Sequence, residues 1–230
     1  MNDILLNSLF FGVMVSFVVY EIGMFARKKC GFAILNPLLF SIVVLILLLA
    51  VFDIDYETYN AGAKYLSYFL TPATVCLAVP LYEQFELLKK NVWAIMAGIV
   101  SGVLTSVVCV LVLSVLLGLS HKEYVTLLPK SITTAIGMGV SQELGGVVTI
   151  TVAVIIITGV FGNIVAEFIC KFFKIEEPIA RGIAIGSSAH AVGTAKAMEL
   201  GEIEGAMSSL SIAVSGLLTV LAASVFARFF

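Results

Sequence analysis

The side chains that could do chemistry are few, and the first group lies between Leu127 and Gln142. Lys130 stands directly before Ser131, and Thr133 and Thr134 follow. Hydroxyl groups at a helix start, together with free backbone N–H groups and the helix dipole, attract anions. The added lysine makes a site for a carboxylate. The alternative is that Lys130 is a solvated charge at a membrane interface.

The second group lies between Ala180 and Glu199, a stretch with almost no bulky apolar side chain. Its glycines permit close approach and a broken helix. Its candidate ligands are Ser187, Ser188, His190, Gly193 and Thr194. An imidazole titrates in the physiological range, so His190 is the candidate proton carrier. The alternatives are a neutral His190 bonded to a backbone carbonyl and a Lys196 that extends to the outer interface.

The composition places both groups in a membrane. The 230 residues are 60% hydrophobic and 12% charged, with a mean hydropathy of +1.12. Soluble domains are about half apolar and about a quarter charged. At about 20 residues for each crossing, the chain has room for about seven transmembrane helices. We therefore expect an all-α integral membrane protein in which residues 1–230 form a single polytopic domain.

Several classes of protein are excluded or disfavoured. A formal net charge of −2 provides no basic surface for nucleic acid. The four cysteines have no CxxC spacing, and there is no phosphate-binding loop or zinc-binding pattern, so we expect neither a metal nor a cofactor. The stretch from Gly186 to His190 lacks the GxSxG elbow of serine hydrolases, and we expect no enzymatic activity.

Two of the apolar segments are expected to be broken. Pro72 and Pro80 lie in the uncharged run 65–82, where each removes a backbone donor and kinks or unwinds the helix. Gly186 is the expected break in the segment 180–199, whose stretch Gly182 to Ala195 is short, bounded by charge and typical of a broken or re-entrant element. Unwound backbone at membrane depth is tolerated where it is buried in protein or lines water. A kinked packing helix is the alternative for the proline segment.

The lysines and arginines predict the orientation, because basic loops stay on the cytoplasmic side. They predict an external N-terminus and a cytoplasmic C-terminus. Lys122 to Gln142 must then re-enter the membrane from one side without crossing it. With that assignment, residues of about 31–120 and 144–230 form two blocks of opposite topology, an inverted repeat with two broken helices, as in many secondary transporters. If Lys122 to Gln142 crosses, the inversion disappears.

Short motifs along nearly the whole chain resemble one family. They are Asn36-Pro37-Leu38, Pro80-Leu-Tyr-Glu-Gln84, Leu128-Pro-Lys-Ser-Ile-Thr-Thr134, Ala180-Arg-Gly182, Ser188-Ala-His190 and Gly193-Thr-Ala195. In order and spacing they are similar to the LrgB/CidB family. One departure is that relatives often have a proline after the threonine pair, where this chain has Ala135.

The resemblance implies both a fold and a setting. The family is related to the cation/proton antiporter and bile-acid symporter folds, whose crossed broken helices fit the two interrupted segments. Its members were first described as antiholin-like regulators of murein hydrolase export and cell lysis, and relatives are linked to pyruvate uptake in bacteria and to glycolate/glycerate exchange in plastids. It also implies the bacterial cytoplasmic membrane and a small LrgA/CidA-type membrane partner.

The leading hypothesis is a secondary transporter of small monocarboxylates of the pyruvate, glycolate or lactate type, coupled to protons. The expected substrate ligands are Lys130, Ser131, Thr133, Thr134, Ser187, Ser188, His190, Gly193 and Thr194. We expect a homodimer, by analogy with other helical membrane scaffolds. One alternative is an antiholin-like regulator of lysis that moves no solute, and another is a passive channel.

Overall fold

The computed structural model describes residues 10–30, 36–76 and 78–230, and these residues form helices joined by short turns. The chain divides into two compact units, Met1–Cys76 and Leu77–Phe230, which are taken one at a time. The predicted external N-terminus lies outside the described residues. All of the predicted carboxylate ligands belong to the second unit.

Unit 1 contains α2 (Phe11–Cys30), α3 (Pro37–Val51), α4 (Tyr56–Ser67) and α5 (Leu70–Cys76). α2 packs against α3 and α4. The hydroxyls of Ser16 on α2 and Tyr59 on α4 lie 2.7 Å apart, and Gly23 brings α2 against the backbone of Pro37 at the start of α3. α3 is apolar but has only 15 residues, fewer than the roughly 20 that a crossing requires.

The two prolines of the predicted broken segment lie in separate short helices. Pro72 is the third residue of α5, and Pro80 is the third residue of α6 (Ala78–Glu83). Proline is tolerated in a first helical turn, because the backbone N–H it lacks has no partner within the helix there. The helical run is interrupted at Tyr68 and Phe69 and again at Gln84.

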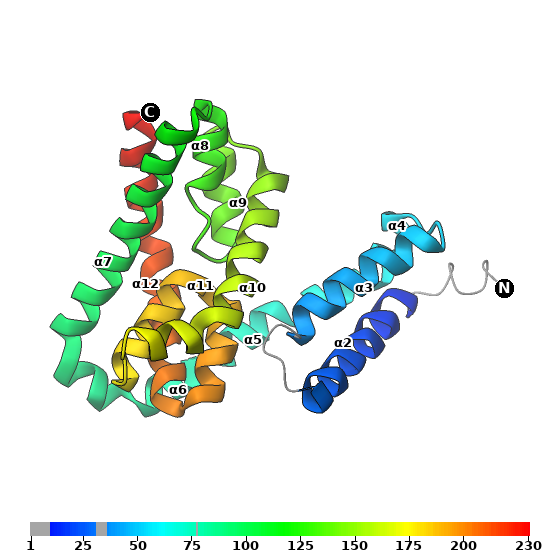
Figure 1. The fold of residues 1–230 in the computed structure, drawn as a ribbon, viewed down its shortest axis with the longest axis horizontal. Helices are drawn as coiled ribbons and strands as arrows, with labels where there is room; N and C mark the ends of the chain where they lie inside the picture. Colours follow the sequence, from blue (N-terminus) through cyan, green and yellow to red (C-terminus); the bar gives the residue numbers. More distant parts are fainter. Residues whose placement is uncertain (1–9, 31–35, 77) are drawn as a thin grey trace. The chain divides into compact units, whose positions relative to one another are not determined.

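Unit 2 is built on three long helices, α7 (Phe85–Leu117), α10 (Val148–Phe172) and α12 (Glu202–Phe226), and α12 continues into the 3-10 turn Ala227–Phe229. α7 and α12 run in the same direction, and α10 runs in the opposite direction (Figure 1). Each of the three is long and apolar enough to cross a membrane, and no other helix in the described part of the chain is. The described residues thus hold three such helices, and the predicted number of about seven is not confirmed by them.

Between α7 and α10 the chain forms a short helical hairpin, hairpin 1. It consists of α8 (His121–Leu127), a turn over residues 128–133 and α9 (Thr134–Glu143). Ten residues of helix extend about 15 Å, half the thickness of a bilayer core. The Thr151 hydroxyl at the start of α10 donates to the Thr126 carbonyl of α8 at 2.8 Å and lies 2.7 Å from the Ser141 hydroxyl of α9. This buried contact ties both arms of hairpin 1 to α10.

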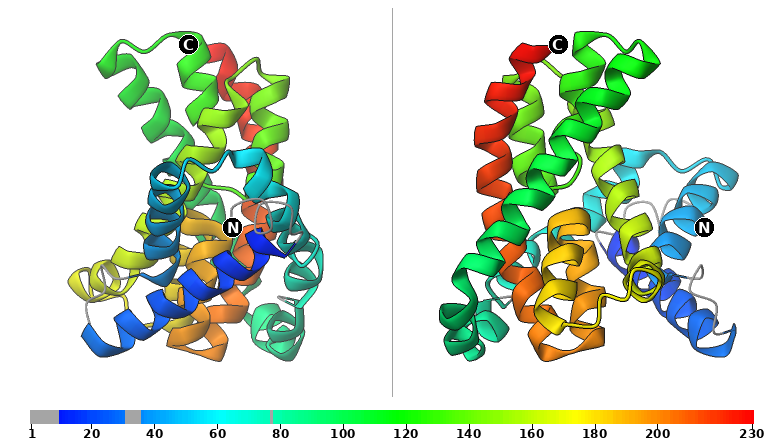
Figure 2. Two further views of the ribbon diagram at one scale, coloured as in Figure 1. Left: turned by 90° about the vertical axis from the view of Figure 1, so that its right-hand side faces the viewer. Right: turned by 60° about the vertical axis from the view of Figure 1, so that its left-hand side comes forward.

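A second hairpin lies between α10 and α12, within α11 (Pro178–Leu200). The helix is interrupted at His190, which separates arm a (Pro178–Ala189) from arm b (Ala191–Leu200). In arm a, Gly182 packs against Glu204 and Gly186 against Ser208, so arm a runs parallel to α12. In arm b the order is reversed, because Thr194 contacts Ser208 and Met198 contacts Gly205. The two arms are seen side by side in Figure 2, and we call them hairpin 2.

Hairpin 2 corrects two predictions. The non-helical residue is His190, not Gly186, which is helical and packs against the backbone of Ser208. The segment 180–199 does not run through unit 2, because arm b returns to the end from which arm a starts. The C-terminus therefore lies at the opposite end of unit 2 from the end of α10 (Figure 1). The carbonyl oxygen of Phe230 is 2.9 Å from Nδ1 of His121, at the start of α8.

In unit 2 a hairpin precedes each of two antiparallel long helices. Hairpin 1 precedes α10, and hairpin 2 precedes α12, which is antiparallel to α10 (Figure 1). The predicted inverted repeat had different bounds, about 31–120 and 144–230, and its first block spans both units. An inverted repeat with those bounds stays a prediction.

Candidate functional site

The tip of hairpin 1 carries a lysine that has no carboxylate partner among the described residues. Lys130 Nζ donates to the Ser131 hydroxyl at 2.9 Å, and the Ser106 hydroxyl of α7 donates to the same oxygen at 3.1 Å. None of the ion pairs among the described residues involves Lys130. An ammonium group has three donors, and a hydroxyl has one donor and two acceptor lone pairs. Two ammonium donors and the Ser131 proton are therefore available to a ligand.

Packing of the hairpin tip holds this group in place. Leu128, Pro129 and Ile132 are almost fully buried around it, and Ser131 is only 7% exposed. Gly137, one turn into α9, packs against the Ile155 side chain of α10. The backbone of Lys130 is therefore fixed, while its side chain remains half-buried. A half-buried ammonium group is stabilised when an anion pairs with it, so Lys130 is suited to bind an anionic ligand.

Lys130 and Ser131 lie in the wall of a cavity of about 1240 Å³. The remaining walls are one face of α7, the second half of α10 and arm a. The cavity continues from Lys130 to Ile175 and Glu177, in the connection between α10 and arm a. Its polar lining comprises Asn91, Ser101, Thr105, Ser106, Lys130, Ser131, Thr158, Glu177, Ser187 and Ser188.

Of the predicted ligands, four line this cavity: Lys130, Ser131, Ser187 and Ser188. The Ser187 hydroxyl donates to the Ile183 carbonyl at 2.7 Å, and the Ser188 hydroxyl donates to the Ala184 carbonyl at 2.6 Å. The protons of both hydroxyls are therefore used within arm a, so that these oxygens can only accept from a ligand, in contrast to the donors around Lys130. Thr133, Thr134, His190, Gly193 and Thr194 are not among the lining residues.

His190 forms the apex of hairpin 2 and is 3% exposed. Its backbone has φ 42° and ψ −141°, a region that residues other than glycine rarely occupy. Its Nε2 lies 3.0 Å from the Ile155 carbonyl oxygen of α10, so the ring donates an N–H there. Gly159, one turn further along α10, leaves room for the ring. The structure thus places His190 inside the protein, fixed to the same residue that packs on hairpin 1.

The other four predicted ligands outside the cavity, two in arm b and two at the start of α9, have packing or helix-start positions. Thr194 donates to the His190 carbonyl at 3.0 Å, and its hydroxyl lies 2.7 Å from the hydroxyl of Ser208. Gly193 lets arm b pack closely on Ala189 and Ile185 of arm a. Thr133 is the N-cap residue of α9 and makes no side-chain capping bond, and Thr134 begins the helix.

The two hairpin tips contact α7 at neighbouring turns. Gly102 lies against the Ser187 hydroxyl of hairpin 2, and Ser106, four residues later, bonds to Ser131 of hairpin 1. Four residues of helix correspond to a rise of about 6 Å. Hairpins 1 and 2, which enter unit 2 from opposite ends, therefore contact α7 at positions about one helical turn apart.

The sequence prediction missed the contribution of α7. Ser101, Thr105, Ser106 and Cys109 line the cavity, and they recur at helical spacing on one face. The signal was present, as hydroxyl groups at i, i+4 and i+5 in a run without charge. In a single sequence this pattern is indistinguishable from the small-residue packing that the nearby Gly98 and Gly102 also indicate.

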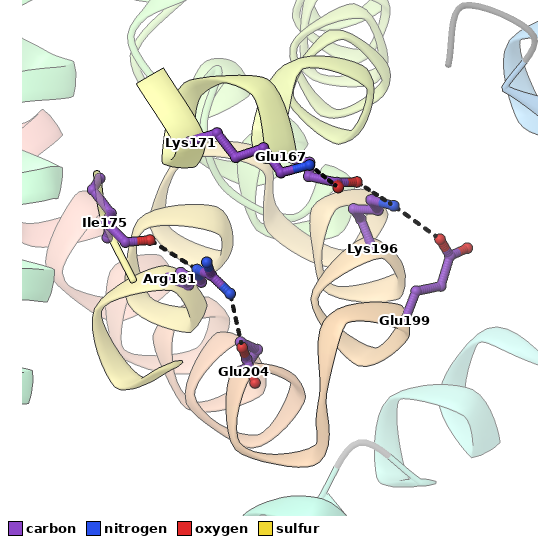
Figure 3. A network of polar contacts seen from close by, with 7 residues as sticks. All are labelled: Glu167, Lys171, Ile175, Arg181, Lys196, Glu199 and Glu204. Carbon is purple, nitrogen blue, oxygen red and sulfur yellow. Dashed lines mark hydrogen bonds and ion pairs between the residues drawn. The ribbon is translucent and has the colours of Figure 1, made fainter. Parts of the chain in front are cut away.

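Lys196 lies away from the cavity, in a group of ion pairs shown in Figure 3. Its Nζ is 3.4 Å from Glu167 Oε2 of α10 and 3.3 Å from Glu199 Oε2 of arm b. Glu167 also pairs with Lys171 at 3.0 Å. Arg181 of arm a lies 3.7 Å from the buried Glu204 of α12 and donates to the Ile175 carbonyl at 2.8 Å (Figure 3).

Comparison with known proteins gives a consistent assignment. The family model described as LrgB-like family matches residues 16–229. The chain is 38% identical over 222 residues to "Antiholin-like protein LrgB" of Bacillus mycoides (strain KBAB4), covering 96% of each chain. The same values hold for the proteins of that name from Bacillus cereus (strain B4264) and Bacillus anthracis (strain CDC 684 / NRRL 3495). No solved structure matches the chain.

Proposed function

The chain belongs to the LrgB-like family of membrane proteins, and we propose that it is a secondary transporter of small monocarboxylates of the pyruvate, glycolate or lactate type. The observation that carries this proposal is the half-buried Lys130, which has no carboxylate partner among the described residues and lies in the cavity wall. A carboxylate would provide the missing charge and two acceptor oxygens. It would accept hydrogen bonds from the Lys130 ammonium and the Ser131 hydroxyl.

The arrangement of the hairpins supports transport over static binding. Broken elements that meet near mid-membrane from both sides are a recurrent feature of secondary transporters. Here hairpin 1 and hairpin 2 enter unit 2 from opposite ends and contact α7 one turn apart. In the proposed mechanism Lys130 and Ser131 hold the carboxylate, and Ser187 and Ser188 accept from a hydroxyl or water beside it. The starts of α9, at Thr133 and Thr134, and of arm b, near Gly193 and Thr194, contribute their helix dipoles.

His190 is the proposed site of proton coupling. Its Nε2–H donates to the Ile155 carbonyl in both protonation states, so the second ring nitrogen is the one that gains or loses a proton. Protonation would place a positive charge at the apex of hairpin 2. That charge would lower the cost of bringing an anion into the region between the hairpins.

The proposed setting is the bacterial cytoplasmic membrane, with a homodimeric assembly, a small LrgA/CidA-type partner and about six crossings, one fewer than predicted because the segment 180–199 reverses at His190. Basic residues gather at one end of unit 2, namely Lys89, Lys90, Lys171, Lys174, Arg181 and Lys196. At the other end are Lys122 and Arg228. The positive-inside rule makes the first end cytoplasmic. It then places the C-terminus outside, the reverse of the prediction from sequence, because hairpin 2 does not cross.

Uptake by the purified chain in proteoliposomes tests the proposal. Labelled pyruvate, lactate, glycolate and acetate would be supplied under an imposed pH gradient, with and without the small partner protein. We expect uptake of at least one acid by the wild type, and a loss of about tenfold or more in Lys130→Gln, since a charge-assisted contact contributes about 1.5–3 kcal/mol. Lys122→Gln, at an exposed position of the same hairpin, is the matched control. Equal uptake by both variants would overturn the assignment of Lys130.

The second candidate function is regulation of cell lysis without solute movement. It is favoured by the printed name of the relatives, antiholin-like protein LrgB. Such a protein requires packing surfaces for a partner, but its function does not require a lysine in a cavity wall. The two functions separate in one comparison: a regulator that moves no solute would keep its effect on lysis in the Lys130→Gln variant, and its wild type would show no uptake.

A further inference from the structure

Hairpin 2 is attached to its neighbours in two different ways. Arm a packs on α7 and α12 through glycines, with Gly98 against Ile183 and Gly182 against Glu204 and Met207. Its residues form a wall of the cavity, whereas no residue of arm b lines it. The position of arm b can affect the cavity through arm a, to which it is joined at His190 and on which Gly193 packs, and through α10, which forms another wall.

Arm b is fastened to α10 by a row of polar contacts. From apex to base they are His190 Nε2 to the Ile155 carbonyl at 3.0 Å, Asn163 Nδ2 to the Val192 carbonyl at 2.7 Å, and Lys196 Nζ to Glu167 Oε2 at 3.4 Å. The α10 residues 155, 163 and 167 are spaced by two turns and one turn, so they lie on one face of the helix. The row extends from the apex to Lys196, in the second half of arm b.

The contact at the base differs from the other two because it depends on charge. Lys196 is 15% exposed and lies between Glu167 of α10 and Glu199 of its own arm (Figure 3). Lys171 pairs with Glu167 as well, but both belong to α10, so this pair joins no two elements. Without the Lys196 ammonium, two carboxylates would face each other across the junction of arm b and α10, and like charges repel.

We propose that Lys196 is a positioning residue that locks arm b to α10 and thereby sets the position of Ser187 against Gly102 in the cavity wall. Its effect on carboxylate uptake rests on the proposed transport function, but the lock itself does not. Of the three contacts in the row, only the one made by Lys196 is an ion pair, so substitution of Lys196 by an uncharged residue removes it. The other two are hydrogen bonds to backbone carbonyls. Removal of the lock leaves arm b held by the hydrogen bonds of His190, Val192 and Thr194, and we expect it to loosen arm b first and arm a through the apex.

Hydrogen exchange of the full chain in nanodiscs tests the lock without any substrate. In Lys196→Gln we expect exchange of arm b amides to rise by about tenfold, because exchange reports the free energy of local opening. Lys196→Arg should stay near the wild type, since it keeps the charge. Lys171→Gln removes the other partner of Glu167 and should leave arm b unchanged. Exchange in hairpin 1 should be the same in all four proteins.

Two results would overturn the proposal. One is wild-type exchange in Lys196→Gln, and the other is an equal rise in Lys171→Gln, which would make the effect one of charge near Glu167 and not of a link between elements. Uptake kinetics add a separate readout: release of the lock should lower the maximal rate more than the apparent affinity. If the wild type moves no carboxylate but the exchange pattern is as expected, the lock stands and the transport proposal fails.

Discussion

The Ser106 hydroxyl of α7 lies 3.1 Å from the Ser131 hydroxyl at the tip of hairpin 1 and donates a hydrogen bond to it. Because Ser131 also accepts from Lys130, the α7 hydroxyl directs the remaining Ser131 proton towards the cavity. The orientation of the site thus depends on a helix that lies outside both hairpins.

Substitution of Ser106 should weaken the site without removing its charge. In Ser106→Ala, Ser131 regains a free lone pair and its proton is no longer directed to the cavity. We expect the apparent KM for the carboxylate to rise by about two- to tenfold, the equivalent of one neutral hydrogen bond of about 0.5–1.5 kcal/mol. Initial uptake rates over a range of substrate concentrations measure it. Ser101→Ala is the control, because that hydroxyl lines the same cavity but donates to the Gly98 carbonyl of its own helix.

Two glycine substitutions should change stability in opposite directions. A Cβ at Gly186 would collide with the backbone of Ser208, whereas a Cβ at Gly139 in α9 would meet nothing within 4 Å. We expect Gly186→Ala to lower the free energy of unfolding by about 1–3 kcal/mol through overpacking. Gly139→Ala should raise it by about 0.5–1 kcal/mol, since alanine is the better helix former. Thermal unfolding in detergent compares the two, and equal midpoints would contradict the close packing of arm a on α12.

The apex of hairpin 2 should prefer glycine to alanine. Both His190→Gly and His190→Ala lose the contact with Ile155, but only glycine adopts φ 42° and ψ −141° without strain. The glycine variant should therefore be more stable than the alanine variant by about 1–3 kcal/mol. At Ala195, an exposed helical position of arm b, substitution by glycine should instead lower the free energy of unfolding by about 1 kcal/mol. If alanine is the better residue at both positions, the chain does not reverse at His190.

Uptake by the histidine variants tests coupling separately from stability. If His190 carries the proton, His190→Gln should still exchange carboxylate across proteoliposomes at equal pH, while an imposed pH gradient should no longer drive accumulation. The measurement is the ratio of accumulation with and without the gradient. A glutamine variant that accumulates substrate as the wild type does would assign the coupling to another group.

The N-terminus of hairpin 1 should lose stability in acid. The Ser120 side chain and backbone N–H donate to the Glu123 carboxylate, and these bonds hold the pKa of Glu123 below its ordinary value of 4.5. A depressed folded pKa stabilises the fold above the ordinary value, and the contribution disappears as the pH falls through the folded pKa. The difference in melting temperature between the wild type and Glu123→Gln should therefore be present at neutral pH, and it should shrink when the pH falls below the ordinary pKa of a glutamate side chain. A difference that stays constant with pH would contradict the capping bond.

The sequence located the segments of interest better than it described them. The stretches around Lys130 and His190 were identified because glycine, serine and threonine replace apolar bulk there. Hairpin 1 was expected from the charges at its two ends. For the segment of hairpin 2, the sequence indicated a broken or a re-entrant element, and the reversal itself could not be located because it falls on a histidine flanked by alanines.

The missing information is tertiary. Arm b turns back because Gly182 and Gly186 allow arm a to lie directly on the α12 backbone, while Ile155 offers a carbonyl to the apex. These contacts join residues far apart along the chain. The role of Ser106 depends in the same way on where the tip of hairpin 1 meets α7, which no local pattern reveals.

The repeated order of hairpin and long helix has a consequence for the direction of the proposed transport. When two structural copies point opposite ways, exchanging their conformations converts a cavity that opens at one face into one that opens at the other. The two arrangements use the same kinds of contact and need not differ much in energy. Neither face of such a protein is inherently the donor side. Net flow of substrate would then follow the gradients on the two sides, and the same chain could serve for uptake under one condition and for release under another.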